Sequence, residues 1–462
     1  MWRRLIILGV IAGVCGINTD QAYSQARALT IRDCIQIALR NNSDLKNAER
    51  RIDLAASGVT SARANILPSI NASFSPARTF QAEQGPFLVD VPIIEDGKVT
   101  RIEQQELFQN EYFRNSFSNS VSISQTIFDG GRWWNQIKQA NADYRSSEFG
   151  HRNTREQTIS TVVQRYYELL KSMDLEQVSE QAVESSREQL RKTEIMYELG
   201  AVAQVDVLRS KVSLGQDLSN LILQRNAVNL NHNNLNIAMG RNPGQPVEIL
   251  SEDPDVQPLE ASTEELWAMA EQSNPELYGL EETLKASDYG RKISKAGFLP
   301  RLTFTGSYSR FNTEFGNLYA PFDKNYQVRG SFSLSWNLFN GFADAAAVDR
   351  ASLTFQINRE NLINRKLTLR NELERAYLNL QANTELERIN EDNVVSAEED
   401  LRLNDERYRV GAGTLLEVID ARVALTRARA VLISTKYNKL IYLVELYSKI
   451  GNVEEKLESI LQ

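Results

Sequence analysis

The side chains that most often carry catalysis or bind metals are scarce in this sequence. It contains two histidines, His151 and His232, and two cysteines, Cys15 and Cys34, in 462 residues. A zinc site needs several His or Cys ligands close together, and a Ser-His-Asp or Cys-His site needs a correctly placed imidazole. The sequence therefore predicts no metal site and no cofactor, and it disfavours nucleophilic catalysis.

Carboxylates late in the chain are the remaining candidates for chemistry. Glu417 and Asp420 are three residues apart, so they share one face of a helix. Such a pair could act as general acid and base, could belong to a solvated helix surface, or could contribute to an acidic ring lining a pore. Gly411, Gly413 and Thr414 do not make a phosphate loop, because no preceding strand and no Gly-Lys-Ser/Thr motif accompany them. No residue suited to act as a catalytic partner is evident near these carboxylates in the sequence. The sequence therefore disfavours an enzyme.

The N-terminal residues have the composition of a secretory signal peptide. Two arginines precede an apolar run, Leu5–Val14, which is shorter than the roughly 20 residues that span a bilayer. Small residues further on suit a signal peptidase, and we predict cleavage after Ser24 or Ala26, with residues 1–24 as the signal peptide. The mature protein is therefore expected outside the cytoplasm.

The cysteines and the net charge exclude further classes. Cys15 could be lipidated, but Val14 is a poor match to the small residue that such processing prefers. After cleavage Cys34 would be a single thiol, and we expect it to be a buried small hydrophobic residue. The formal net charge of -8 and the pI near 5.3 argue against a nucleic-acid partner, which requires a basic face.

Two long stretches lack proline, the residue that most often interrupts helices. No proline lies between Pro92 and Pro243, and none follows Pro321. The stretches predict long helices at 132–199 and 343–410, each roughly 100 Å long at 1.5 Å per residue. Because no single globular core is that long, these helices must pack side by side in a layer.

The two halves of the chain are related in sequence. At a constant offset of 211 residues, Val121–Gly131 aligns with Phe332–Phe342, and Tyr197–Leu214 aligns with Tyr408–Leu425. Asp206 is therefore the repeat counterpart of Glu417. Upstream the offset is 232, so the first copy carries 21 additional residues, which we predict to lengthen a loop.

Each copy is expected to read helix, strand, strand, long helix, long helix. The predicted organisation is the signal peptide; repeat 1 at 25–241, with strands at about 69–80 and 115–128 and long helices at about 132–199 and 203–240; a Pro-rich linker at 242–262; repeat 2 at 263–451, with strands at about 301–311 and 328–339 and long helices at about 343–410 and 414–450; and a short tail at 452–462. Residues 75–114 and 312–327 are expected to be external loops.

The predicted strands alternate between large apolar and small polar residues. This pattern suits a tilted transmembrane β-strand, and a half-buried soluble sheet would show the same period. The export signal favours the membrane, and because four strands cannot close a barrel, several chains must share one. The residues expected to face lipid are Phe117, Val121, Ile123, Phe304, Phe332, Leu334 and Trp336.

The arrangement resembles the TolC-like outer-membrane efflux proteins over nearly all of the mature chain. The most specific element is YRVGAGTLLEVIDARVAL, Tyr408–Leu425, with a weaker counterpart at Tyr197–Leu214. The resemblance implies a mixed fold, an all-α barrel of long helices joined to a transmembrane β-barrel, with both barrels completed by trimerisation. It implies an exit duct in the outer membrane that extends into the periplasm and works with a periplasmic adaptor and an inner-membrane transporter.

The resemblance also assigns roles at the periplasmic end. It implies a gate or pore lining at Asp206, Tyr408, Glu417 and Asp420, and an adaptor-docking tip at Gly200, Ala201, Gly411, Ala412 and Gly413. Relatives carry a basic residue at the position of Gly413, so how the gate is locked is left open. The sequence does not identify the cargo, which could be drugs, metal ions or a polypeptide. The alternative interpretation is an exported periplasmic coiled-coil scaffold or adaptor protein.

Overall fold

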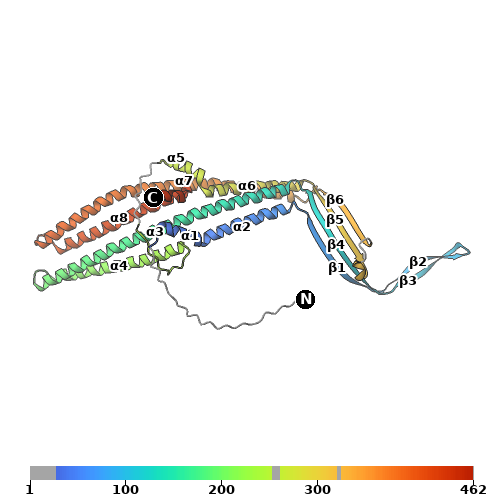
Figure 1. Cartoon of the computed structure of the whole chain (residues 1–462), viewed down its shortest axis with the longest axis horizontal. Coiled ribbons are helices and arrows are strands. Elements are labelled where there is room, and N and C mark those ends of the chain that lie inside the picture. Colours follow the sequence, from blue (N-terminus) through green and yellow to red (C-terminus); the bar gives the residue numbers. More distant parts are fainter. Residues whose placement is uncertain (1–27, 252–260, 320–323, 461–462) are drawn as a thin grey trace, which may run out of the picture.

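The computed structural model describes residues 28–251, 261–319 and 324–460. The predicted signal peptide, its cleavage site and Cys15 lie outside the described residues, as does the central part of the predicted linker. The described chain is elongated, with long helices at one end, a sheet at the other and a narrow β-ribbon beyond the sheet (Figure 1).

The helices follow the two related halves of the sequence. Capping boxes, Thr30 with Asp33 and Ser262 with Glu265, begin the first helix of each half. The first half contains α1 Ile31–Asn41, α2 Ser43–Ala64, α3 Arg132–Glu198 and α4 Gln204–Ala238. The second contains α5 Thr263–Ser273, α6 Pro275–Lys295, α7 Ala343–Arg409 and α8 Leu415–Ile450, followed by α9 Val453–Ile460.

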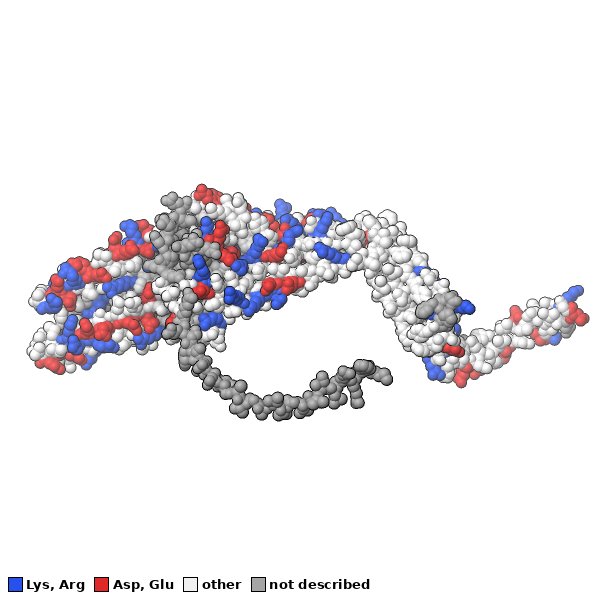
Figure 2. All heavy atoms as spheres, viewed as in Figure 1, with Lys and Arg blue, Asp and Glu red and all other residues white. Residues whose placement is uncertain are grey.

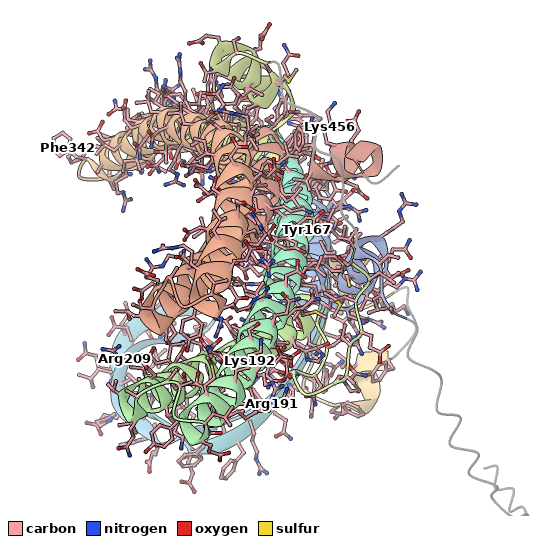
Figure 3. All side chains as sticks on the ribbon, turned by 90° about the vertical axis from the view of Figure 1, so that its left-hand side faces the viewer. Tyr167, Arg191, Lys192, Arg209, Phe342 and Lys456 are labelled. Atoms are coloured by element: carbon pink, nitrogen blue, oxygen red, sulfur yellow. The ribbon has the colours of Figure 1, made fainter. Side chains whose placement is uncertain are left out.

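Helices α3 and α7 have 67 residues each, and both their boundaries are 211 positions apart. At 1.5 Å per residue each is roughly 100 Å long. Helix α3 packs against α4, and α7 packs against α8, so each half forms a long helical hairpin, while contacts between α3 and α8 join the two hairpins. Seen from the hairpin end, the long helices trace a curved layer (Figure 3).

The cores lie where the short helices cross the long ones. One core joins α1, α3, α4 and α8 around the fully buried Tyr166, Leu235 and Met239. Cys34 is buried in this core, which confirms the sequence expectation. The second core joins α5, α6, α7 and α8 around Leu369 and Leu446.

The main sheet contains β1 Ser69–Gln81, β4 Tyr112–Phe128, β5 Arg301–Asn312 and β6 Tyr326–Ser335. Its order is β1-β4-β5-β6, and every neighbouring pair is antiparallel. Strands β1 and β6 are therefore the two edges, each with a row of backbone groups that no strand of the same chain pairs among the described residues. Figure 2 shows few charged side chains over this sheet and many over the helices.

The predicted external loop at 75–114 is wrong for most of its length. Strand β1 continues to Gln81, and β2 Gln84–Glu95 and β3 Lys98–Gln109 form an antiparallel ribbon. Their turn contains Asp96 and Gly97, both with positive φ, of 51° and 77°. Two adjacent residues with positive φ form a tight two-residue hairpin turn, and Asp-Gly is a strong sequence signal for such a turn. The hairpin was therefore predictable from the sequence.

Two further boundaries differ from the sequence expectation. Strand β6 ends at Ser335 rather than near Phe339. The expected tail at 452–462 contains α9, which is held by paired side chains: Arg155 of α3 binds Glu454 at 2.9 Å and 2.5 Å, and the backbone N–H of Val453 donates to Glu156 at 2.8 Å. Among the described residues, no helix has the length and apolarity needed to cross a bilayer.

Two glycines end the returning helices at equivalent positions in the two halves. Gly240 after α4 has φ of 70°, and Gly451 after α8 has φ of 91°. A Cβ at Gly240 would lie 2.8 Å from the carbonyl carbon of Asn41, and one at Gly451 would lie 2.7 Å from Cδ of Pro275. Each long hairpin is thus seated on the break between two short helices, where only glycine fits.

We predict that Gly451→Ala lowers the free energy of unfolding by on the order of 1–2 kcal/mol from the left-handed backbone alone, with the close contact adding to this cost. The control Gly150→Ala, in α3 with no neighbour within 4 Å, should instead raise it by roughly 0.5–1 kcal/mol. Thermal loss of helical circular dichroism measures both. Equal melting temperatures for the two variants would contradict the seating of α8.

Candidate functional site at the helix tips and the sheet

The two hairpin tips are built from the same turn. Gly200 and Gly411 have φ of 72° and 73°, and the next N–H of each turn, from Ala201 and Ala412, donates to a helix carbonyl at 2.8 Å. A Cβ at either glycine would meet nothing within 4 Å. The predicted tip residues Gly200, Ala201, Gly411 and Ala412 are exposed, so both tips present small side chains and open backbone.

Gly413 differs from the other tip residues because it is half-buried. A Cβ there would lie 3.0 Å from Oε2 of Glu417 and 3.2 Å from Cβ of Arg407. A basic side chain at this position would require both neighbours to shift. The cation nearest to Glu417 comes instead from Arg407, whose Nη2 lies 3.9 Å from the carboxylate.

Glu417 has a structural role that the sequence interpretation missed. Its Oε2 accepts the backbone N–H of Thr414 at 3.0 Å, and its own N–H donates to Oγ1 of Thr414 at 3.3 Å. This capping box begins α8. The Thr-x-x-Glu spacing at the start of an apolar run is its sequence signal. Asp420, one turn later on α8, is exposed.

Asp206 and Tyr408 belong to different hairpins, and the charge of Asp206 is near enough to act on the Tyr408 hydroxyl. Asp206 is in the first turn of α4, and Tyr408 is in the last turn of α7. The Tyr408 hydroxyl is buried without a hydrogen-bond partner. Its burial raises the pKa of Tyr408, and the nearby charge of Asp206 raises that pKa further. Asp206 lies 3.8 Å from Arg209, a residue labelled near this tip in Figure 3.

A groove runs between α4 and α8 from the tips toward the middle of the molecule. Near the tips it encloses about 320 Å³, lined mainly by Val205, Leu208, Val212, Leu416 and Ile419. It continues into a space of about 720 Å³ with a polar lining that includes Asp217, Arg422 and Arg427.

The main sheet has two chemically different faces. Phe304 and Phe332 lie directly opposite each other on one face, with ring centroids 5.0 Å apart. On the other face the hydroxyls of Ser73 and Ser120 are 2.8 Å apart. The ladder registers place Val121, Ile123, Phe304, Tyr308, Phe332 and Leu334 on the apolar face, and Ser120, Ser122, Ser124, Thr305, Ser307 and Ser333 on the polar face.

Trp336 is not in the apolar strand row in which the sequence placed it. It follows the end of β6, and its indole N–H donates to the carbonyl of Phe298 at 3.0 Å. With Asp129 and Arg301 it lines a space of about 590 Å³ where the sheet meets the helices. A tryptophan with one apolar side and one hydrogen-bonded N–H is typical of a membrane–water boundary rather than a membrane centre.

Comparisons with known proteins give the same picture. The sequence matches the family Outer membrane efflux protein over residues 34–241 and 266–452. It is 22% identical to the toluene efflux pump outer membrane protein TtgC of Pseudomonas putida, over 91% of this chain and 82% of that protein. It is 23% identical to the outer membrane protein TolC of Vibrio cholerae, over 95% of this chain and 92% of that protein. The fold is similar to a crystal structure of CusC, with a TM-score of 0.79, 18% identity and coverage of 91% and 92% of the two chains.

The chain belongs to the outer membrane efflux protein family, whose model matches most of its length. Its two-faced sheet at one end and its long helical hairpins at the other agree with the fold of the similar solved structure. It is an exit duct of the outer membrane, and it extends into the periplasm. The resemblance to TolC-like proteins noted in the sequence is therefore confirmed.

Proposed function

We propose that three copies of this chain form a passive, non-enzymatic duct across the outer membrane and the periplasm. The observation that carries the proposal is the open, two-faced sheet: one face is apolar, the other bears Ser and Thr, and both edges, β1 and β6, are unpaired within the described chain. Open edges are not tolerated in lipid. Because β1 and β6 run in opposite directions, β6 of one copy can continue an antiparallel sheet onto β1 of the next.

Three sheets joined in this way give a barrel of twelve strands, with the apolar face toward lipid and the hydroxyl face toward the lumen. The curved layer of long helices in Figure 3 supports a matching tube on the periplasmic side. We propose that residues 1–24 are removed on export and that the repeats at 25–241 and 263–451, joined by the linker at 242–262, each supply one strand pair and one long hairpin.

The duct requires partners because it has no energy source of its own. We propose that a periplasmic adaptor docks at the tip formed by Gly200, Ala201, Gly411, Ala412 and Gly413, and that an inner-membrane transporter drives the cargo. Exposed small residues support this role, since they allow a partner's backbone to approach closely. The rival function, a soluble coiled-coil scaffold, would leave the apolar face of the sheet without a purpose.

The periplasmic gate follows from the same assembly. In a trimer Asp206, Glu417 and Asp420 each occur three times around the narrow end of the helices. Like charges held close together attract cations. The approach of Tyr408 to Asp206 across the two hairpins supports a closed resting form. Opening would move the inner pair, 377–408 and 415–446, outward when the adaptor favours the open form.

The barrel is tested by charge placed on either face of β6. Phe332→Arg should destabilise the folded barrel by on the order of 2–4 kcal/mol if it lies near the bilayer midplane, and Trp336→Arg, at the boundary, should cost only about 0–1 kcal/mol. The matched control is Ser333→Arg on the opposite face, which should cost far less than Phe332→Arg. Folding into lipid vesicles under urea titration gives these values. Equal costs for Phe332→Arg and Ser333→Arg would refute the assignment of the faces.

The gate is tested by removing charge while keeping the helix cap. Glu417→Gln preserves the capping box, since glutamine also serves at that position, and Asp420→Asn removes the second charge. The double variant should keep its thermal stability but lose cation selectivity and block by divalent cations in planar-bilayer recordings.

The control for the gate is Glu49→Gln, an equal charge change at an exposed site on α2, which should leave conductance unchanged. If the double variant conducts like the unmodified protein, Glu417 and Asp420 do not line the pore.

A further inference from the structure

The four strands of the main sheet carry charge of one sign. Strands β1, β4, β5 and β6 contain arginines but no aspartate, glutamate or lysine. The arginines are Arg78, Arg114, Arg301, Arg310 and Arg329. The whole chain has a net charge of -8, so the sheet differs in charge from the rest of the protein. Acidic residues of the neighbouring ribbon belong to β2 and β3, which extend beyond this sheet.

The ladder registers decide which face of the sheet each arginine occupies. Arg329 is directly opposite Ser307, and Arg301 is directly opposite Ser335. Both arginines therefore lie on the hydroxyl face. Arg301 donates from Nη2 to Oγ1 of Thr126, another residue of that face, at 2.9 Å. The side chains of Arg301 and Arg329 are exposed, and both residues belong to the four-stranded part of the sheet.

The other three arginines lie elsewhere. Arg78 is on the apolar face, where its guanidinium carbon lies 4.8 Å from the centre of the Phe113 ring. Arg310 is also on the apolar face, and it is buried. Arg114 is on the hydroxyl face, but it lies beyond the last pair that β4 forms with β5, so it is outside the four-stranded part.

In the proposed trimer the hydroxyl face lines the lumen, so Arg301 and Arg329 would each form a ring of three. Arg301 and Ser307 are both on β5, and Ser307 is opposite Arg329, so the two rings are roughly 20 Å apart along the strands. Twelve strands about 4.8 Å apart and tilted by about 40° make a barrel roughly 24 Å across. Arginine side chains on its inner wall bring their charge within about one Debye length of the axis at 0.1 M salt.

Carboxylates do not neutralise these rings. Asp129 and Arg132, which follow β4, line the same space of about 590 Å³ as Arg301. Two cations and one carboxylate leave that region positive. The ring at Arg329 has no acidic residue on any of the four strands to offset it. Rings of arginine in a pore attract anions and repel cations.

We propose that the barrel part of the duct is an anion-attracting passage, with Arg301 and Arg329 as the residues that set its selectivity. The solutes it favours carry carboxylate, phosphate or sulfonate groups. The acidic residues proposed for the gate act at the opposite end of the molecule. This inference rests on the proposed duct function, and it names the charge class of solute that the barrel favours.

Block of the current by an inert anion tests the two rings. The probe is hexacyanoferrate(II), a multivalent anion, added to the chamber that faces the barrel of the purified protein in planar bilayers. It should reduce the current at 0.1 M salt and lose this effect at 1 M salt, where the Debye length is about 3 Å. Arg329→Gln should raise the half-blocking concentration roughly tenfold at 0.1 M salt, and combining it with Arg301→Gln should raise that concentration further.

The matched control is Arg78→Gln, the same change of charge on the apolar face, which should leave the half-blocking concentration unchanged. Arg329→Lys keeps the charge and should keep the block. Equal half-blocking concentrations for the unmodified protein, Arg329→Gln and the double variant would overturn the arginine rings, as would a conducting protein that the probe does not block. If the unmodified protein never conducts, the duct function itself fails, and this outcome is separate from failure of the rings.

Discussion

The requirement that backbone N–H and C=O groups be paired within a bilayer determines most of this structure. A chain whose main sheet has four strands leaves one row of such groups on β1 and another on β6. The alternation of apolar and hydroxyl side chains gives the same sheet one apolar and one polar face. In the assembly that we propose, further copies of the chain close the barrel, and the layer of helices follows the symmetry of that barrel.

The helical end has a different requirement, which is length combined with rigidity. Length comes from continuous helices of 67 residues, and rigidity comes from the cores where short helices cross them. The glycine seats at 240 and 451 fix the returning helices at the same point in each half. Toward the tips, buried residues continue along α8 at Leu415, Val418 and Ala421, beside the open groove between α4 and α8.

Much of this organisation is readable from sequence, since the absence of proline, the offset of 211 and the strand alternation are properties of single segments or of their comparison. The features that were not predicted, the ribbon and the cap of α8, depend on short local motifs. The Asp96-Gly97 turn predicts the ribbon, and the spacing of Thr414 and Glu417 predicts a helix cap. The position of Trp336 and the nearness of Asp206 to Tyr408 depend on how distant segments pack, which no local pattern specifies.

We propose that the sheet of one chain is an open part of a barrel and that three chains close it. The most direct measurement is the number of chains in the protein extracted from outer membranes, by light scattering in detergent and by gel migration before and after heating. The account predicts a complex of three chains that resists detergent and separates into single chains on boiling. A soluble periplasmic monomer whose migration does not change on heating would contradict it.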